Sequence, residues 1–535
     1  MKTRRLQAAA GLCAAALLLG LTACSSDKGE ASKAKAEGAE GAAREAADFN
    51  ETGYPIAKSP IKLKMFAQRA PLNGPYKDML FFQDYAKKTG IEVQWEDVPA
   101  EGFAERKNLL LSSDELPDAL YKAAITPLEA VKYGSSGLLV PLEQLIDRHA
   151  PNLKALLEKN PEILASIKAP DGHIYALPAV IELPAARTDK AWLNTAWLRK
   201  LNLREPSTTD ELVRVLTAFR DGDPNGNGKK DEIPMTELDQ AAVISSLAGS
   251  WGLDYQLGYN LNIKDGKVDS WLDDQAYKDY LGFLNKLYAE KLLDPEVFSQ
   301  KPTQYYAKMA AAQAGYLHNQ AGDPFGEKKD EYAGIAPLSG PAGIRTVWAK
   351  PVARDFGTFA VTSADKHPDA TIRWIDYFYG EEGSTLFRYG IEGQTFSFKA
   401  DGLPEYNESI RTDKRGMGTA IGQFTSWPGG GAPQLLIEKN ASAVNPPSVQ
   451  EAQKKLDPYL PKAIYGAPLL DEKTNKELDT LRQDLDAYVA ESTAKFITGA
   501  LPLDKWDEYA KTLKGLGLPR LEEIYQNAFD NTQSH

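Results

Sequence analysis

The chain switches between two hydrophobic periods over its first folded stretch. Residues 61–65 and 91–96 each carry an apolar side chain at every second position, which predicts two strands. Between them, residues 76–89 place their large apolar side chains mostly on one face, which predicts a helix that Gly90 ends. A short third strand is expected at residues 119–121. The repeated strand, helix, strand order predicts an α/β fold with a mainly parallel sheet.

The middle and the end of the chain are dominated by the helical period. Residues 208–211 read Thr-Thr-Asp-Glu, a capping box that predicts the start of a helix. Residues 277–288 keep an apolar stripe at a 3.6-residue period, and residues 474–477 are expected to open a further helix of the same kind. Residues 356–379 return to a strand followed by a helix, which could rejoin the first sheet.

This order of elements predicts two lobes that the chain crosses several times. We expect residues 57–185 and 350–396 in an N-lobe, and residues 186–349 and 397–535 in a C-lobe. Clefts between domains are preferred ligand sites, so a ligand is expected between the lobes. A length of 535 residues with 43% hydrophobic and 10% aromatic residues agrees with a folded body of two or more domains.

The N-terminus has the layout of a secretory signal. Three basic residues precede an apolar run over residues 6–21, which is too short to span a bilayer comfortably. The run ends in Leu-Thr-Ala-Cys and resembles the bacterial lipobox, which implies cleavage before Cys24 and lipid attachment to that cysteine. We therefore expect residues 1–23 to be a signal peptide and residues 24–56 to be a lipidated N-terminus and disordered tether. An ordinary secretory signal cut after Ala23 is the alternative.

Charge and cysteine content narrow the classes of partner. A net charge of −12 argues against a nucleic-acid partner. Cys13, the other of the two cysteines, lies in the leader, so the mature chain has one thiol and no internal disulfide. No later apolar stretch is long enough to cross a bilayer, so the membrane would be reached through lipid alone. We expect a monomer.

Oxygen-bearing residues alternate in one loop of the predicted C-lobe, as in a calcium loop. Gly228 stands at the sixth position, where a sharp turn is needed. The loop departs from an EF-hand because position twelve is Pro234 and Lys230 replaces the usual apolar residue. We expect structural Ca²⁺, with a metal-free turn as the alternative. The predicted ligands are Asp223, Asn225, Asn227, the Lys229 carbonyl, Asp231 and Glu232.

Five short motifs carry a family resemblance over nearly the whole mature chain, at residues 116–119, 137–142, 171–178, 223–228 and 389–393. In order and spacing they resemble the extracellular solute-binding proteins of bacterial ABC importers, especially the large lipoproteins that bind oligosaccharides. The resemblance implies a two-lobe fold of the type II periplasmic-binding-protein class, whose lobes close over ligand by hinge motion. It also implies an oligosaccharide ligand, permease subunits of an ABC transporter as partners, and a structural calcium loop like that of alginate-binding members.

Two kinds of residue are candidates for contacting such a ligand. Tryptophans stack on sugar rings, and two of them stand in loops with Gly or Ser neighbours, whereas Trp192, Trp197 and Trp374 lie at helical spacings and are expected in the core. Polar residues at strand ends are the second kind. The candidate ligand-binding residues are Gln68, Arg69, Asp118, Trp251, Arg354 and Trp427.

Enzyme motifs are missing from the sequence. No HExxH, Gly-x-Ser-x-Gly or phosphate-loop pattern occurs, and the five histidines lack ligand spacing. A glycosidase needs only two carboxylates, so a surface polysaccharide hydrolase stays open as an alternative. A binding protein for peptides or another solute is the second alternative. The leading hypothesis is a binding protein for oligosaccharides that is not an enzyme.

Overall fold

The computed structural model describes residues 49–113, 115–320, 323–443 and 445–533. The predicted signal peptide, Cys24 and most of the predicted tether lie outside these residues. Among the described residues, no helix has both the length and the apolar character that crossing a bilayer requires.

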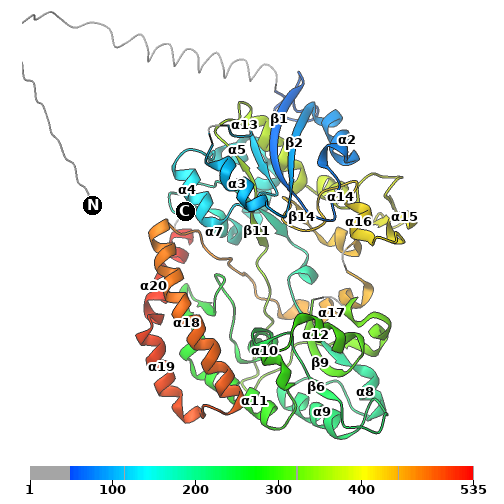
Figure 1. Ribbon diagram of the computed structural model, residues 1–535, viewed down its shortest axis with the longest axis vertical. Coiled ribbons are helices and arrows are strands. Elements are labelled where there is room, and N and C mark those ends of the chain that lie inside the picture. Colours follow the sequence, from blue (N-terminus) through cyan, green and yellow to red (C-terminus); the bar gives the residue numbers. More distant parts are fainter. Residues whose placement is uncertain (1–48, 114, 321–322, 444, 534–535) are drawn as a thin grey trace, which may run out of the picture. The chain divides into compact units, whose positions relative to one another are not determined.

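Strands from widely separated parts of the sequence form a six-stranded sheet in the order β14-β4-β11-β3-β1-β2 (Figure 1). The strands are β1 (Ile61–Arg69), β2 (Ile91–Pro99), β3 (Ala119–Tyr121), β4 (Leu177–Ile181), β11 (Ala353–Val361) and β14 (Leu435–Leu436). Pairing of β1 with β2 and β3 is parallel, as the strand, helix, strand order predicts, whereas β11 runs antiparallel to β3 and β4. The three strands predicted near the N-terminus are confirmed.

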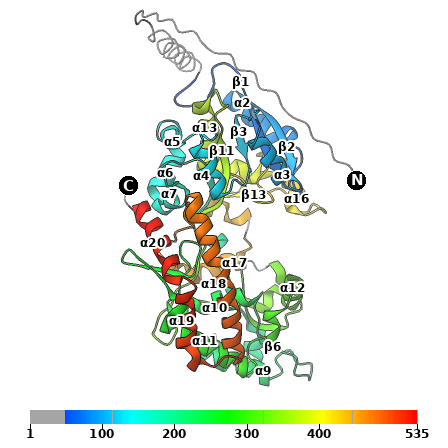
Figure 2. The same cartoon turned by 60° about the vertical axis from the view of Figure 1, so that its left-hand side comes forward.

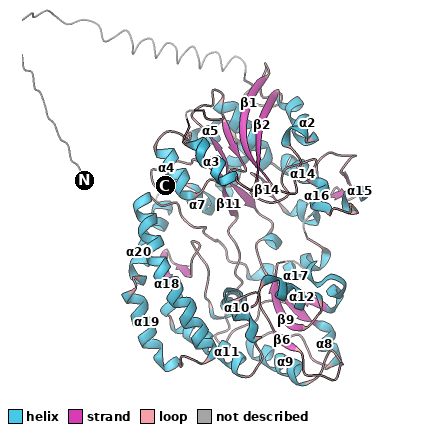
Figure 3. Ribbon diagram, in the orientation of Figure 1, coloured by secondary structure: helices cyan, strands magenta, loops and turns pink. Residues whose placement is uncertain are grey.

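Helices flank the strands of this sheet (Figure 3). They are α2 (Leu80–Thr89), α3 (Phe103–Leu111), α4 (Pro127–Ser135), α5 (Glu143–His149), α6 (Pro151–Lys159), α7 (Pro161–Ile167), α13 (Pro368–Asp376) and α14 (Glu381–Tyr389). Aromatic rings fill the space between sheet and helices: Trp374 of α13 stacks on Phe82 of α2, with ring centroids 6.3 Å apart. The fully buried Trp374 confirms its predicted core position. We call this sheet and its helices the first lobe.

A second, four-stranded sheet has the order β10-β5-β9-β6. Its strands are β5 (Lys190–Asn194), β6 (Ile233–Met235), β9 (Ala314–Asn319) and β10 (Tyr332–Gly334). Its helices are α8 (Thr195–Lys200), α9 (Thr209–Asp221), α10 (Gln240–Leu247), α11 (Gln275–Ala289), α12 (Pro302–Ala310) and α17 (Pro447–Leu456). The remaining short strands and α-helices of the described residues are β7 (Leu261–Lys264), β8 (Lys267–Ser270), β12 (Phe396–Phe398), β13 (Pro404–Tyr406), α15 (Glu408–Arg411) and α16 (Met417–Ile421). We call the four-stranded sheet and its helices the second lobe; Trp192 and Trp197 are buried there, as predicted.

Two predicted helix starts have different outcomes. The Thr208 hydroxyl accepts the Glu211 backbone N–H at 3.1 Å and caps α9, although the Glu211 carboxylate turns back to the N–H of Ser207 rather than that of Thr208. The start predicted at residue 474 is wrong. Helix α18 begins two residues earlier, because the carboxylate of Asp471 accepts the Thr474 N–H at 3.0 Å and supplies the cap.

The C-terminal helices α18 (Glu472–Thr498), α19 (Trp506–Gly515) and α20 (Leu518–Gln533) lie side by side (Figures 1 and 2). Helix α18 packs against α11 of the second lobe. The apolar stripe predicted for α18 does face inward, since Leu478 and Leu485 are buried. A left-handed Gly499 at φ 79° ends this helix.

The chain passes between the two sheets after β4, after β10 and after β14. Strand β14 pairs with β4 through Leu435 and Leu436, so this part of the chain belongs to the first sheet. We therefore propose an N-lobe that takes in the residues up to 436, beyond the boundary at residue 396 that the sequence predicts.

Candidate functional site

A cavity of about 780 Å³ lies in the second lobe, next to the segments that lead to and from the first sheet. Its walls come from the turn before β5, from α10, from the end of β9, and from residues 335–351 between β10 and β11. A cavity of this size holds a ligand of several rings. We call it the second-lobe cavity.

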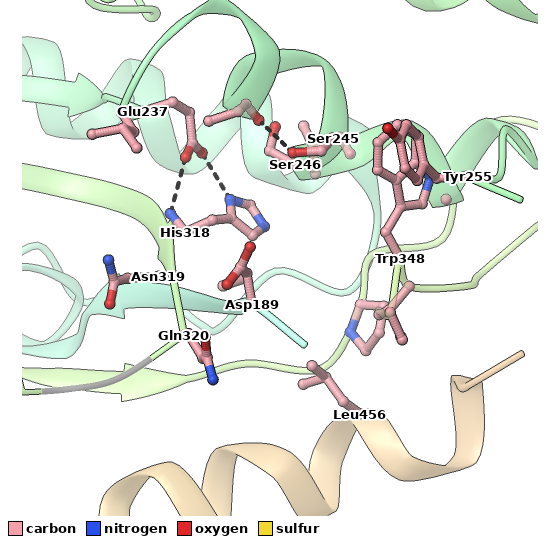
Figure 4. Close-up of a pocket in the computed structure, with 18 of the residues that line it drawn as sticks. Asp189, Glu237, Ser245, Ser246, Tyr255, His318, Asn319, Gln320, Trp348 and Leu456 are labelled. Carbon is pink, nitrogen blue, oxygen red and sulfur yellow. Dashed lines mark hydrogen bonds and ion pairs between the residues drawn. The ribbon is translucent and has the colours of Figure 1, made fainter. Parts of the chain in front are cut away.

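A buried contact between a carboxylate and an imidazole forms the polar part of its wall. Glu237 Oε1 lies 2.7 Å from His318 Nδ1, and Glu237 Oε2 accepts the His318 backbone N–H at 3.2 Å (Figure 4). Parallel pairing of β6 with β9 sets Met235 opposite Tyr316, and two residues further this register brings Glu237 to His318. Glu237 is fully buried, and burial raises the pKa of its carboxyl. Both oxygens of this carboxylate are thus occupied by one histidine.

Asp189 contributes a second carboxylate to the cavity. It is exposed, and its side chain points toward the His318 imidazole (Figure 4). Among the described residues no hydrogen bond or ion pair reaches the Asp189 carboxylate. An ionised carboxylate only accepts hydrogen bonds, so Asp189 is suited to a ligand that donates them.

Aromatic side chains form the apolar part of the wall. The rings of Tyr255 and Trp348 lie 5.3 Å apart between centroids at 35°, and both line the cavity (Figure 4). The Trp348 indole N–H donates to the carbonyl of Leu253 at 2.6 Å, and the Tyr255 hydroxyl donates to that of Gly258 at 2.9 Å. Both rings are therefore held in place while keeping an apolar face, which is the arrangement that stacks on sugar rings.

None of the six predicted ligand-binding residues lines this cavity. Arg69 forms an ion pair with Asp97 at 3.0 Å, and Asp118 accepts the Lys64 backbone N–H at 2.7 Å. Gln68 is half-buried beside Arg69 on β1, and Arg354 of β11 donates to the carbonyl of Ala186 at 3.1 Å. Ligand contact by these residues stays a prediction.

The two predicted stacking tryptophans lie in different environments. Trp251 is 8% exposed and packs on Tyr280 and Phe283, with ring centroids 4.7 and 5.0 Å away, so it belongs to the core of the second lobe. Trp427 is half-buried against the first lobe. One of its faces carries the guanidinium of the buried Arg388, 3.8 Å from the ring centroid.

The sequence reasoning missed the residues that do line the cavity. Trp348 has neither Gly nor Ser among its three nearest neighbours on either side, so the loop criterion applied to Trp251 did not find it. Glu237 and His318 carry no such signal, because they are 81 residues apart and meet only through sheet pairing.

The predicted calcium loop connects α9 to β6 and is folded around Asp223. The Asp223 carboxylate accepts the backbone N–H groups of Gly226, Asn227 and Gly228 at 2.9 to 3.1 Å. Asn227 Oδ1 accepts the Lys229 N–H at 2.7 Å. Gly228 has φ +74°, in the left-handed region that favours glycine, as its predicted place in the turn requires.

This loop carries oxygen donors of the kind that a hard cation binds. The side-chain amides of Asn225 and Asn227 donate to the Asp231 carboxylate and hold its pKa below the ordinary value. Both carboxylate oxygens of Glu232 are buried without a hydrogen-bond partner among the described residues. Neither this loop nor any other part of the described residues holds a group of three His, Cys, Asp or Glu side chains placed to bind a metal ion. A site in this loop would therefore depend on amide and carbonyl oxygens as well, which Ca²⁺ accepts.

Comparison with known proteins places these features in context. The family model for bacterial extracellular solute-binding proteins matches residues 71–385. The fructooligosaccharide ABC transporter substrate-binding protein FusA of Streptococcus pneumoniae is 29% identical over 88% of this chain and 91% of its own length. The polygalacturonan/rhamnogalacturonan-binding protein YtcQ of Bacillus subtilis is 23% identical over 88% of this chain and 92% of its own.

Solved structures of FusA have the same fold. Its complex with kestose superposes with a TM-score of 0.65 at 28% identity, covering 88% of this chain and 99% of that one. An EF-hand mutant of FusA in complex with fructo-nystose superposes equally well, with the same score, identity and coverage.

Proposed function

Because the chain belongs to the bacterial extracellular solute-binding protein family and has its two-lobe α/β fold, we propose that it captures an oligosaccharide and delivers it to the permease of an ABC transporter. The second-lobe cavity is the observation that carries this proposal. It combines fixed aromatic faces at Tyr255 and Trp348 with convergent polar groups at Asp189 and His318. Apolar walls with a few placed polar groups are what a sugar, with its alternating CH faces and hydroxyls, requires.

In this proposal the protein binds the oligosaccharide and does not hydrolyse it. A glycosidase needs one carboxyl group that gives a proton and a second carboxylate across the scissile bond. In the second-lobe cavity, both carboxylate oxygens of Glu237 are engaged by His318. Asp189 is therefore the one carboxylate of the cavity lining that is available to a ligand. FusA and YtcQ are binding proteins. A reducing-end assay on soluble glycans would reveal the hydrolase alternative as a rise in reducing ends.

Calorimetry and thermal shift over a panel of neutral oligosaccharides, acidic oligosaccharides and peptides test the ligand class. We expect sugars to raise the melting temperature and peptides to leave it unchanged, because a ligand that binds only the folded state stabilises it by mass action. A matched control compares Trp348→Ala with Trp251→Phe, since only the first side chain lines the cavity. Stabilisation by peptides alone would contradict the proposal.

We propose Ca²⁺ in the loop between α9 and β6, held by Asp223, Asp231 and Glu232 together with the oxygens of Asn225, Asn227 and Lys229. The buried, unpartnered carboxylate of Glu232 supports it, because such a charge is costly unless a cation compensates it. The role is structural, since the loop lies outside the cavity lining.

Titration of chelated protein with CaCl₂ tests the calcium proposal. Glu232→Gln is expected to weaken binding at least about tenfold, whereas Glu158→Gln, an exposed glutamate on α6, should leave it unchanged. Absence of both heat and thermal stabilisation on adding Ca²⁺ would show that the loop is only a turn.

We also propose that lipid on Cys24 holds the protein at the outer face of the cell membrane. A diacylglycerol supplies the two chains that stable attachment needs. A Cys24→Ser protein should appear in the medium with sugar binding intact; retention in the membrane fraction would contradict this anchor.

A further inference from the structure

The second-lobe cavity presents its negative and positive side chains to a ligand differently. Its carboxylates are Asp189 and Glu237, and its cationic side chains are Arg187 and Lys350. Asp189 is exposed, points toward His318, and has no hydrogen bond or ion pair within the described part of the chain. It is therefore the ionised group that a ligand entering this cavity meets without competition from a protein donor.

The cations near the cavity have partners within the protein. Arg187 is half-buried and its Nε donates to the backbone carbonyl of Lys350 at 2.7 Å. Burial lowers the pKa of Arg187, and Glu162 and Glu182, which lie outside the cavity lining, oppose this shift. The ammonium group of Lys190, next to Asp189, is buried. It donates to the carbonyls of Ala185 and Thr188 at 2.5 and 2.8 Å.

His318 also cannot donate two hydrogen bonds to the carboxylate of a ligand. Its Nδ1 is occupied by Glu237 at 2.7 Å, and its backbone N–H donates to the same carboxylate. A uronate carboxylate is recognised well by a bidentate Arg. Of the cations that line the cavity, Lys350 alone has an exposed side chain, and its own carbonyl is engaged by Arg187. A mobile lysine gives a point charge without that geometry.

We infer that the oligosaccharide bound in the second-lobe cavity is neutral, and that Asp189 selects it by accepting sugar hydroxyls and repelling uronate carboxylates. The inference rests on the proposed function. A sugar hydroxyl always has a proton to donate, and a carboxylate can accept two of them from one ring. Hydrogen bonds to a charged acceptor are the stronger kind, so Asp189 would contribute both affinity and selectivity. The relatives include a fructooligosaccharide-binding protein and a polygalacturonan/rhamnogalacturonan-binding protein, so the choice is not fixed by family membership.

Calorimetry with length-matched neutral and acidic sugars tests this inference. The probes are neutral tri- and tetrasaccharides of fructose, glucose, galactose and mannose, and tri- and tetragalacturonate. We expect at least one neutral sugar to bind and the galacturonates to bind at least about a hundredfold more weakly, because their carboxylates would lie beside a carboxylate of the same charge.

Asp189→Asn is the matching variant, with Asp265→Asn in the exposed β7–β8 turn as the control for loss of one charge. Asp189→Asn should weaken the neutral sugar about tenfold, the loss expected for one charged acceptor, while Asp265→Asn should not change its affinity. Because Asp189 is exposed, equal melting temperatures of the two variants will show that the fold is intact.

The outcomes separate the two proposals. Galacturonate binding as tight as neutral-sugar binding would overturn the inference and leave the proposed function standing. An unchanged affinity in Asp189→Asn would overturn the role of Asp189. Binding of neither class would overturn the proposed function and the inference together.

Discussion

Lys122 is a buried lysine without a carboxylate in contact. Replacing it by Met tests how its protonation changes the stability of the first lobe with pH. Its side chain is 1% exposed, and its ammonium group donates to the carbonyls of Ser426 and Pro428 at 2.8 and 3.3 Å. Asn73 Oδ1 lies 3.4 Å away. These contacts connect the end of β3 to the loop that carries Trp427.

Burial lowers the pKa of Lys122 from 10.5 to about 7, with Asp355 opposing the shift. A difference of about 3.5 pKa units corresponds to about 5 kcal/mol between the two protonation states. Between about pH 7 and about pH 10 the unfolded chain holds a proton that the folded chain lacks, so the stability of the native protein rises with pH. Below about pH 7 both states are protonated and the full cost of the buried charge remains.

The Met variant lacks this titration, so its stability relative to the native protein should fall by about 2 kcal/mol from about pH 7 to about pH 9. Guanidinium unfolding curves at several pH values, followed by tryptophan fluorescence, measure this difference. Lys64→Met, an exposed lysine on β1, is the matched control. A difference between Lys122→Met and native protein that stays constant within about 0.5 kcal/mol over this range would refute the reasoning.

Three further predictions concern the cavity and a second buried charge. Trp348→Ala should weaken oligosaccharide binding at least about tenfold by calorimetry, because a stacking face is lost; a change below about twofold would contradict this. Glu237→Gln should destabilise the protein by about 3 kcal/mol in chemical denaturation, since it breaks a buried pair with His318; a loss below about 1 kcal/mol would count against that pair. Burial raises the pKa of Asp376 to about 6. The native protein should therefore lose about 2 kcal/mol relative to Asp376→Asn as pH rises from about 4 to about 6, and a flat difference in unfolding free energy would be the contrary result.

Much of the secondary structure followed from local patterns. The alternating segments at residues 61–65 and 91–96 became β1 and β2, and the Thr208 cap starts α9, because strand period and capping chemistry depend on neighbouring residues only. The start of α18 was misplaced for the same kind of reason: Asp471 and Thr474 are both good caps, and the sequence alone did not rank them.

Long-range pairing decided where the lobes begin and end. Strand β14 has two residues, too few for any period to show, and only its pairing with β4 assigns it to the first sheet. Glu237 and His318 are likewise joined by the register of β6 and β9. Pairing between distant segments has no signature in either segment taken alone.

The tryptophans show most clearly what the sequence determined and what the tertiary structure decided. Composition and loop context identified aromatic residues suited to stacking on sugars, and the spacing from Asp223 identified a loop of oxygen donors. Trp251 has that local context and Trp348 lacks it, yet Trp251 is enclosed by rings from α11 and Trp348 lines the cavity. Accessibility is set by what packs against a side chain, and the segments that pack there come from elsewhere in the chain. The sequence therefore determined the chemistry available to this protein, while packing decided which of those groups a ligand can reach.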